Sequence, residues 1–216
     1  MRETKAVLFD LDGTLLDSRG DLADAVNATR AALGVEPLSD EAVGGHIGRG
    51  LTALLEQALP PLRPIEFQAS RAVFIAHYSA NLLNRSRPYE GVNDMFSGLR
   101  GYRLGLVTNK PSMFTHAILR GLGWDTRFEI VVCGDTMPTR KPSPEPLLFG
   151  LEKLGATPAS AVFVGDTAVD AETAAAVGAP FVCVEWGAHA AQTPRAHVIG
   201  ALSELPAWVE RTLGTT

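Results

Sequence analysis

Short apolar runs recur along the chain, and most are followed by a stretch with helical spacing. Apolar runs lie at 6–9, 103–107, 129–133, 161–164, 180–184 and 197–199. Helices are predicted over 93–99, 112–122, 145–154, 169–177 and 202–213. Strands buried on both faces read as continuous apolar runs, and strands that alternate with helices form parallel sheets. The pattern therefore predicts an α/β fold, with a doubly wound parallel sheet and right-handed crossovers.

Residues 18 to about 87 show no strand pattern and read as helices instead. Apolar residues recur at helical spacing over 22–33, 51–59 and 67–82, and a shorter helical piece is expected from about residue 39. Ser18 and Asp21 have the spacing of a capping box, which marks the start of the first of these helices. This block predicts an all-helical insertion between the first strand and the rest of the sheet.

Two carboxylates follow the first apolar run, at the point where its strand should end. They are Asp10 and Asp12, and Gly13 then allows the chain to turn sharply. Ligands of open α/β sheets bind at the carboxyl ends of the strands. Two aspartates this close repel each other unless a cation or a shared proton compensates. The pair therefore predicts a functional site at this edge of the sheet.

Three later segments repeat this design. Thr108 and Asn109 end the second apolar run, just before a predicted helix whose free backbone N–H groups suit an anion. Lys141 precedes another helix start, where a positive charge is unfavourable unless an anion lies nearby. Asp166 ends a further strand. Asp170 has the spacing of a helix cap with Thr167, which explains Asp170 structurally but leaves Asp166 unexplained.

Together these segments resemble the four motifs of the haloacid dehalogenase superfamily of phosphotransferases. The matching stretches are 10–18, 108–110, 141–142 and 165–170, and their order and spacing cover nearly the whole chain. The resemblance implies a Rossmann-like catalytic core of residues 1–16 plus 88–216. It also implies a helical cap of residues 17–87, joined through hinges near 17–18 and 87–88, which closes over the strand ends.

The residue types suit phosphoryl transfer. A phosphate monoester repels an attacking carboxylate, so a cation such as Mg²⁺, held by Asp10 and Asp166, is expected to neutralise both. Asp10 is the expected nucleophile, giving an aspartyl-phosphate. Asp12 is expected to protonate the leaving group and then to deprotonate the attacking water, which requires a raised pKa. The resemblance supports these roles and adds the Asp12 backbone carbonyl as a metal ligand.

The other motif residues are expected to hold the phosphoryl group. Thr108, the backbone of Asn109 and Lys141 would contact its oxygens, where negative charge accumulates in the transition state. Asp170 would orient Lys141 or the water molecules of the metal.

The substrate is predicted from further strings. Residues 46–51, 89–92 and 133–136, with 140–142, look most like those of phosphoglycolate phosphatases. Arg49 departs from that family, whose members usually carry a small polar residue between the two glycines. Its planar fork suits a carboxylate, so Arg49 is predicted to hold the far end of 2-phosphoglycolate. A solvated arginine in a flexible loop is the alternative.

Other activities remain open or disfavoured. A β-phosphoglucomutase keeps the equivalents of Asp10 and Asp12, so that activity stays open, as does a pyrophosphatase of the same superfamily. The presence of Asp12 argues against carbon–halogen hydrolysis. A receiver domain, which is phosphorylated as a switch without turnover, also places Asp, Thr and Lys at strand ends. The helical insertion and Asp12 argue against a receiver.

Composition narrows the partners. The 216 residues carry a net charge of −5, with no basic patch for nucleic acid. The longest run without charged residues, 72–84, is too short to span a bilayer. Cys133 and Cys183 read as buried free thiols of a reducing cytosol, which predicts a cytoplasmic protein. The expected partner is a small phosphorylated metabolite, and the expected assembly is a monomer or a homodimer.

Overall fold

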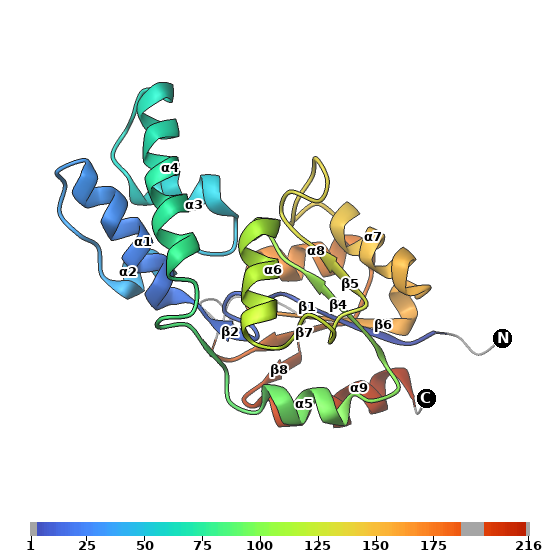
Figure 1. Ribbon diagram of the computed structural model, residues 1–216. Coiled ribbons are helices and arrows are strands. Elements are labelled where there is room, and N and C mark those ends of the chain that lie inside the picture. The colour runs from blue at the N-terminus through green and yellow to red at the C-terminus, as the bar shows by residue number, and fades with distance from the viewer. Residues whose placement is uncertain (1–3, 187–196, 215–216) are drawn as a thin grey trace.

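A six-stranded parallel sheet forms the centre of the protein (Figure 1). The structure, a computed structural model, describes residues 4–186 and 197–214. In sheet order the strands are β5 (Ile130–Val132), β4 (Arg103–Val107), β1 (Ala6–Phe9), β6 (Ala161–Gly165), β7 (Phe181–Val184) and β8 (His197–Ile199). Every neighbouring pair in this sheet is parallel. The predicted α/β fold is confirmed, and β1 lies between β4 and β6.

Helices cover both faces of the sheet (Figure 1). The side chains of β1 alternate between the two faces. Val7 and Phe9 pack in one apolar cluster with α5 (Val92–Gly98) and α9 (Leu205–Leu213). Ala6 and Leu8 pack in another cluster with α7 (Glu145–Leu154) and α8 (Ala168–Val177). The predicted helix over 202–213 begins as a 3₁₀ turn, Leu202–Glu204.

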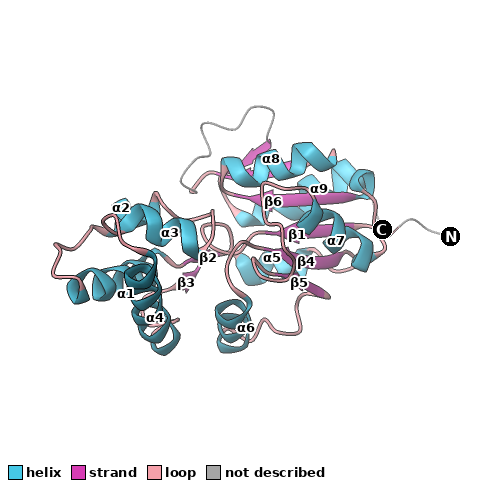
Figure 2. Cartoon of the chain, turned by 90° about the horizontal axis from the view of Figure 1, so that it is seen from above, coloured by secondary structure: helices cyan, strands magenta, loops and turns pink. Residues whose placement is uncertain are grey.

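A second group of helices lies beside the sheet and has its own apolar core (Figure 2). Its members are α1 (Arg19–Ala32), α2 (Asp40–Gly44), α3 (Leu51–Ala58) and α4 (Pro64–Ala80). Val26, Leu55 and Phe74 are fully buried in this core. Phe114 of α6 (Ser112–Gly121) packs into the same cluster. The helix that follows β4 therefore joins the helical group to the sheet.

The two chain crossings between these parts form a small sheet that the sequence pattern did not predict. β2 (Leu16–Asp17) pairs antiparallel with β3 (Arg87–Pro88). We propose that residues 17–87 form a cap on a core of residues 1–16 plus 88–216. The pairing of β2 with β3 at both crossings supports this division, because it brings the two connections side by side.

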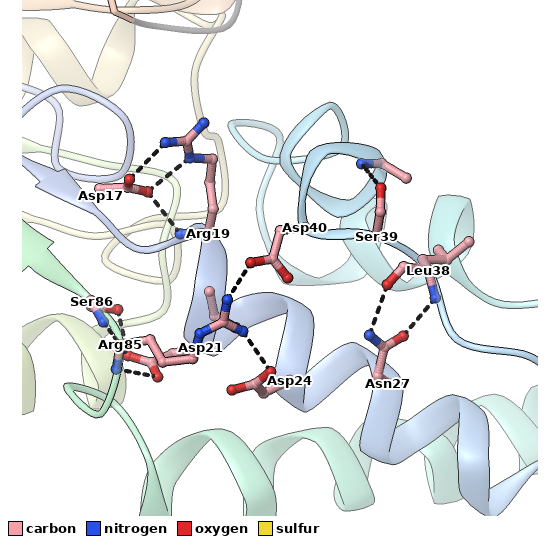
Figure 3. Close-up of polar contacts among 12 residues, drawn as sticks. Asp17, Arg19, Asp21, Asp24, Asn27, Leu38, Ser39, Asp40, Arg85 and Ser86 are labelled. Carbon is pink, nitrogen blue, oxygen red and sulfur yellow. Dashed lines mark hydrogen bonds and ion pairs between the residues drawn. The ribbon is translucent and has the colours of Figure 1, made fainter.

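The predicted capping box at Ser18 and Asp21 is wrong, because both side chains have other partners. Ser18 makes no capping hydrogen bond, and its hydroxyl donates to Asp12 at 2.6 Å. Asp21 accepts hydrogen bonds from the backbone of Arg85 and from the backbone and hydroxyl of Ser86, over 2.6 to 2.8 Å (Figure 3). The buried Asp21 carboxylate thus ties the two crossings together.

Among the described residues, no helix combines the length and the apolar character that spanning a bilayer requires. Cys133 and Cys183 are both buried and form no disulfide, as predicted.

Candidate active site

The predicted site residues meet at the carboxyl edge of the sheet. Asp10 follows β1, Thr108 follows β4 and Asp166 follows β6. Since β4 and β6 flank β1, these three strand ends are neighbours. Each side chain is at least nine-tenths buried. Hydrogen bonds from the backbone N–H of Asp10 to β6 and of Thr108 to β5 fix both strand ends.

Three carboxylates form a buried acidic cluster. Asp10, Asp166 and Asp170 each offer one oxygen, and these oxygens lie within 4.8 Å of one another. Burial, and then the charges of Asp170 and Asp12, raise the pKa of Asp10 to about 6, against an opposing effect of Lys141. Burial and the neighbouring carboxylates also hold the pKa of Asp166 well above its usual range.

The cluster suits a divalent cation. Asp10 Oδ1 is buried and receives no hydrogen bond from the described residues, although the Lys141 ammonium lies 3.0 Å away. Asp166 Oδ1 accepts from the Thr14 hydroxyl at 2.9 Å. Clustered carboxylates with unfilled acceptor capacity are costly without a cation, and hard divalent ions prefer such oxygen ligands.

This cluster predicts a pH dependence of stability for the metal-free protein. The pKa of Asp10 is about 6 in the folded state, against an ordinary value of 3.8. The folded protein therefore binds this proton more tightly than the unfolded chain does. The resulting stabilisation is complete below the unfolded pKa and is lost as the pH rises through the folded one. The test is urea unfolding of the wild type and of Asp10→Asn in the presence of a chelator. Between about pH 4 and 6, the free energy of unfolding of the wild type should fall relative to that of Asp10→Asn. Parallel curves would contradict this.

Lys141 lies between two of the carboxylates and is held on both sides. Its ammonium is 3.0 Å from Asp10 and 2.6 Å from Asp170. Burial opposes its charge, but these carboxylates more than compensate, so the pKa of Lys141 is raised. Asn109 bonds the backbone N–H and C=O of Lys141 with its side-chain amide, at 3.0 and 2.9 Å. Thr167 and Asp170 form the predicted capping box of α8, which fixes Asp170.

The Asp12 carboxylate accepts hydrogen bonds from Ser18 and Lys110. The sequence pattern assigned Lys110 no role of its own. The Lys110 ammonium lies 2.9 Å from both Asp12 oxygens, and Ser18 donates to Oδ1. Burial opposes the charge of Lys110, but Asp12 and Tyr78 outweigh it and raise the pKa of the ammonium. Lys110 could have been identified from its position, because it follows Thr108 and Asn109 directly at the end of a strand.

Two glycines allow the acidic side chains to approach the backbone. Gly13 has φ +84°, and a Cβ there would lie 2.3 Å from Asp166 Oδ2. A Cβ on Gly165 would lie 2.5 Å from the Cβ of Asp170. Both positions therefore need glycine, Gly13 for its left-handed backbone as well as for space.

The structure does not bring Arg49 to the carboxylates. Arg49 is exposed and lines a surface cleft with Thr167 and Val169. Its neighbour Gly48 is tied to the core, because Asn109 Nδ2 donates to the Gly48 carbonyl at 2.9 Å. The glycine-bounded loop therefore contacts the site through its backbone, while the guanidinium lies outside the chamber that contains Asp10.

Known proteins match this architecture over most of the chain. A family model described as haloacid dehalogenase-like hydrolase matches residues 7–184. A phosphoglycolate phosphatase of Xylella fastidiosa (strain Temecula1) is 39% identical, over 85% of this chain and 81% of the relative. An N-acetylmuramic acid 6-phosphate phosphatase of Pseudomonas aeruginosa is 36% identical, over 85% of this chain and 82% of the relative.

A solved structure agrees. A crystal structure of a predicted phosphoglycolate phosphatase from Haemophilus somnus 129pt has a TM-score of 0.89 at 30% identity, covering 96% of this chain and 99% of the other. Fold and sequence together define a hydrolase built on a parallel sheet. The chain belongs to the haloacid dehalogenase-like hydrolase family, and the resemblance drawn from the four motifs is confirmed.

Proposed function

We propose that the protein is a magnesium-dependent phosphatase that hydrolyses a small phosphate monoester, 2-phosphoglycolate, in the cytoplasm. The observation that carries the activity is the buried Asp10 carboxylate, which lies beside the Lys141 ammonium and two further carboxylates at the strand ends. The matched phosphoglycolate phosphatase supports the choice of substrate. A monomer or a homodimer is the proposed assembly.

Asp10 is the proposed nucleophile and Asp12 the proposed acid and base. One Asp10 oxygen bonds to phosphorus as the bond from phosphorus to the ester oxygen breaks. Asp12, in its protonated form, gives its proton to the departing alkoxide. It then takes a proton from the water that attacks the aspartyl-phosphate, so that Asp10 and inorganic phosphate are released. Ser18 and Lys110 hold the Asp12 carboxyl group beside Asp10 for both steps.

The proposed metal ligands are the side chains of Asp10 and Asp166 and the backbone carbonyl of Asp12. A bound Mg²⁺ would offset the negative charges of the carboxylates and the phosphate. Asp170 is proposed as an orienting residue only, because both of its oxygens already accept hydrogen bonds, from Lys141 and from Thr167.

Thr108, the backbone of Asn109 and Lys141 are proposed to hold the phosphoryl oxygens. The side-chain amide of Asn109 bonds Lys141 and Gly48, which supports a role for its backbone in binding phosphate. Arg49 remains a proposed specificity residue. Because its side chain lies in an outer cleft, it would contact the substrate only after the loop between α2 and α3 moves.

Replacing Asp170 with alanine should lower kcat by ~10–100-fold, the usual loss when a partner of a catalytic group is removed. Lys141 would keep Asp10 as its only remaining carboxylate among those it contacts in the structure. Asp170→Asn is the matched control, since its amide oxygen can still cap α8. Activity is measured as phosphate release. Equal losses in both variants would show that the lost contact with Lys141 causes the fall in kcat. Full activity of Asp170→Ala would contradict the role.

The substrate is tested by phosphate release with Mg²⁺ over a panel. The panel comprises 2-phosphoglycolate, sugar phosphates, N-acetylmuramic acid 6-phosphate, nucleotides and pyrophosphate. The highest kcat/KM is expected for 2-phosphoglycolate. A preference for pyrophosphate, or isomerisation of a sugar phosphate without net release, would overturn the proposal. A stable phosphoprotein that never turns over would point to a receiver instead.

A further inference from the structure

A small chamber lies between the cap and the edge of the sheet, on the side of Asp12 that faces α4. Its volume is about 40 Å³. Asp10, Asp12, Thr108, Asn109 and Lys110 line it from the core. The remaining wall is almost entirely apolar, and its larger members are Leu22, Leu51, Leu54, Phe74, Tyr78 and Phe114. The chamber therefore has room for a very short organic group next to the proposed nucleophile.

Tyr78 brings an unsatisfied donor to this apolar wall. It is fully buried, and the Lys110 ammonium beside it can only donate a hydrogen bond, so the hydroxyl proton has no acceptor among the described residues. Burial raises the pKa of Tyr78 to about 12, so the hydroxyl keeps its proton at neutral pH. A buried donor without an acceptor is unfavourable, and such groups in native proteins call for an explanation. A ligand that accepts a hydrogen bond would satisfy it.

Lys110 places a positive charge beside Tyr78. Its Nζ is 4.8 Å from the centre of the Tyr78 ring. It donates to the two oxygens of Asp12, and an ammonium has three N–H donors. Both side chains are almost fully buried. A cation and a hydroxyl proton without an acceptor, beside the apolar part of the chamber wall, form a complementary site for an anion that accepts several hydrogen bonds.

We propose that Tyr78 and Lys110 bind the carboxylate of the substrate's leaving group and so determine its specificity. This inference rests on the proposed phosphatase activity. The substrate class is the phosphate ester of a short hydroxy acid, in which the ester oxygen and a carboxylate oxygen are separated by three bonds. Asp12 must reach the ester oxygen, and Lys110 contacts Asp12 directly. The carboxylate therefore falls beside Lys110 and Tyr78, and the apolar wall encloses the short carbon chain.

Binding of two inert phosphonates tests this without turnover. 3-Phosphonopropionate resembles 2-phosphoglycolate with carbon in place of the ester oxygen, and propylphosphonate lacks the carboxylate. Calorimetry with Mg²⁺ should show that the wild type prefers the carboxylated compound. In Tyr78→Phe the preference should fall by ~10-fold or more, because a hydrogen bond to a charged group is lost. The ring remains, so affinity for propylphosphonate and the melting temperature should be kept.

Two further variants sharpen the test. Tyr102→Phe is the matched control, because that hydroxyl bonds the Gly214 carbonyl at the amino end of β4, away from the chamber. Its preference should equal that of the wild type. Lys110→Gln should also lower the preference for the carboxylated compound, and it is compared by binding alone because Lys110 also holds Asp12. An unchanged preference in Tyr78→Phe, or a preference that depends on Arg49 instead, overturns the inference.

The two proposals fail separately. If the wild type hydrolyses 2-phosphoglycolate but binds both phosphonates equally, the carboxylate site is refuted and the activity stands. If it prefers 3-phosphonopropionate through Tyr78 yet releases no phosphate from any ester, the activity is refuted and the binding site is supported.

Discussion

Replacing Asp10 with asparagine is expected to lower turnover by ~10³-fold or more, because the proposed nucleophile is lost. The fold should survive. Asparagine has the shape of aspartate, and burial together with neighbouring carboxylates already disfavours the charge at this position, as the raised pKa of about 6 indicates. The metal-free variant should therefore unfold at a temperature no lower than that of the wild type at neutral pH. Activity is measured as phosphate release with Mg²⁺.

Asp12→Asn provides the matched comparison, because it removes the acid and base but keeps the nucleophile. Formation of the aspartyl-phosphate from an activated ester needs little help from an acid, whereas its hydrolysis needs a base. Mass spectrometry after rapid quenching should find phosphate on Asp10 in Asp12→Asn and none in Asp10→Asn. Near-native turnover of Asp10→Asn, or a phosphoryl group on another residue, would refute the mechanism.

Much of the fold was predictable because its determinants are local. The four residues of β1 are fully buried, so the strand is a continuous apolar run. Strand β4 occupies the predicted range, Arg103–Val107. Helix α4 begins at Pro64, earlier than its apolar residues indicate, because Arg63 and Glu66 cap it with polar contacts. Polar helix ends are less visible in an apolar pattern than helix middles are.

The core side of the site was predictable for a related reason. Parallel strands bring their carboxyl ends to one edge of the sheet. Because β4, β1 and β6 are neighbours, Asp10, Thr108 and Asp166 meet at that edge. Contacts between the helical group and the strand ends could not be predicted in this way, because they depend on how α4 packs beside the sheet. Tyr78 reads in sequence as one more apolar position of a helix. Only the structure, which places Tyr78 beside Lys110, reveals a buried hydroxyl whose proton has no acceptor in the described part of the chain.

The same distinction explains Ser18 and Arg49. The spacing of Ser18 and Asp21 satisfies a local rule, but contacts to Asp12 and Ser86 take both side chains away from the helix end. Arg49 lies in a glycine-bounded loop with no periodicity, so its direction cannot be read from sequence. The structure places it in an outer cleft.

Removing divalent metal with a chelator is expected to abolish turnover, and Mg²⁺ should restore it. Ca²⁺ should inhibit, because its larger and more flexible coordination does not hold the reacting groups in line. The structural basis is the buried acidic cluster, whose oxygens lie within 4.8 Å of one another and whose members Asp10 and Asp166 have raised pKa values. Burial and repulsion among the carboxylates raise these pKa values, and a bound cation would offset both effects.

A second readout separates metal binding from catalysis. Because Mg²⁺ would relieve repulsion among the carboxylates, it should raise the melting temperature of the wild-type protein. Asp166→Ala removes one proposed ligand, so both the thermal shift and the activity should be lost. Glu152→Ala, at an exposed position of α7, is the control and should keep both. Undiminished phosphate release in chelator, or an equal Mg²⁺-induced shift in Asp166→Ala, would show that this cluster does not bind the catalytic metal.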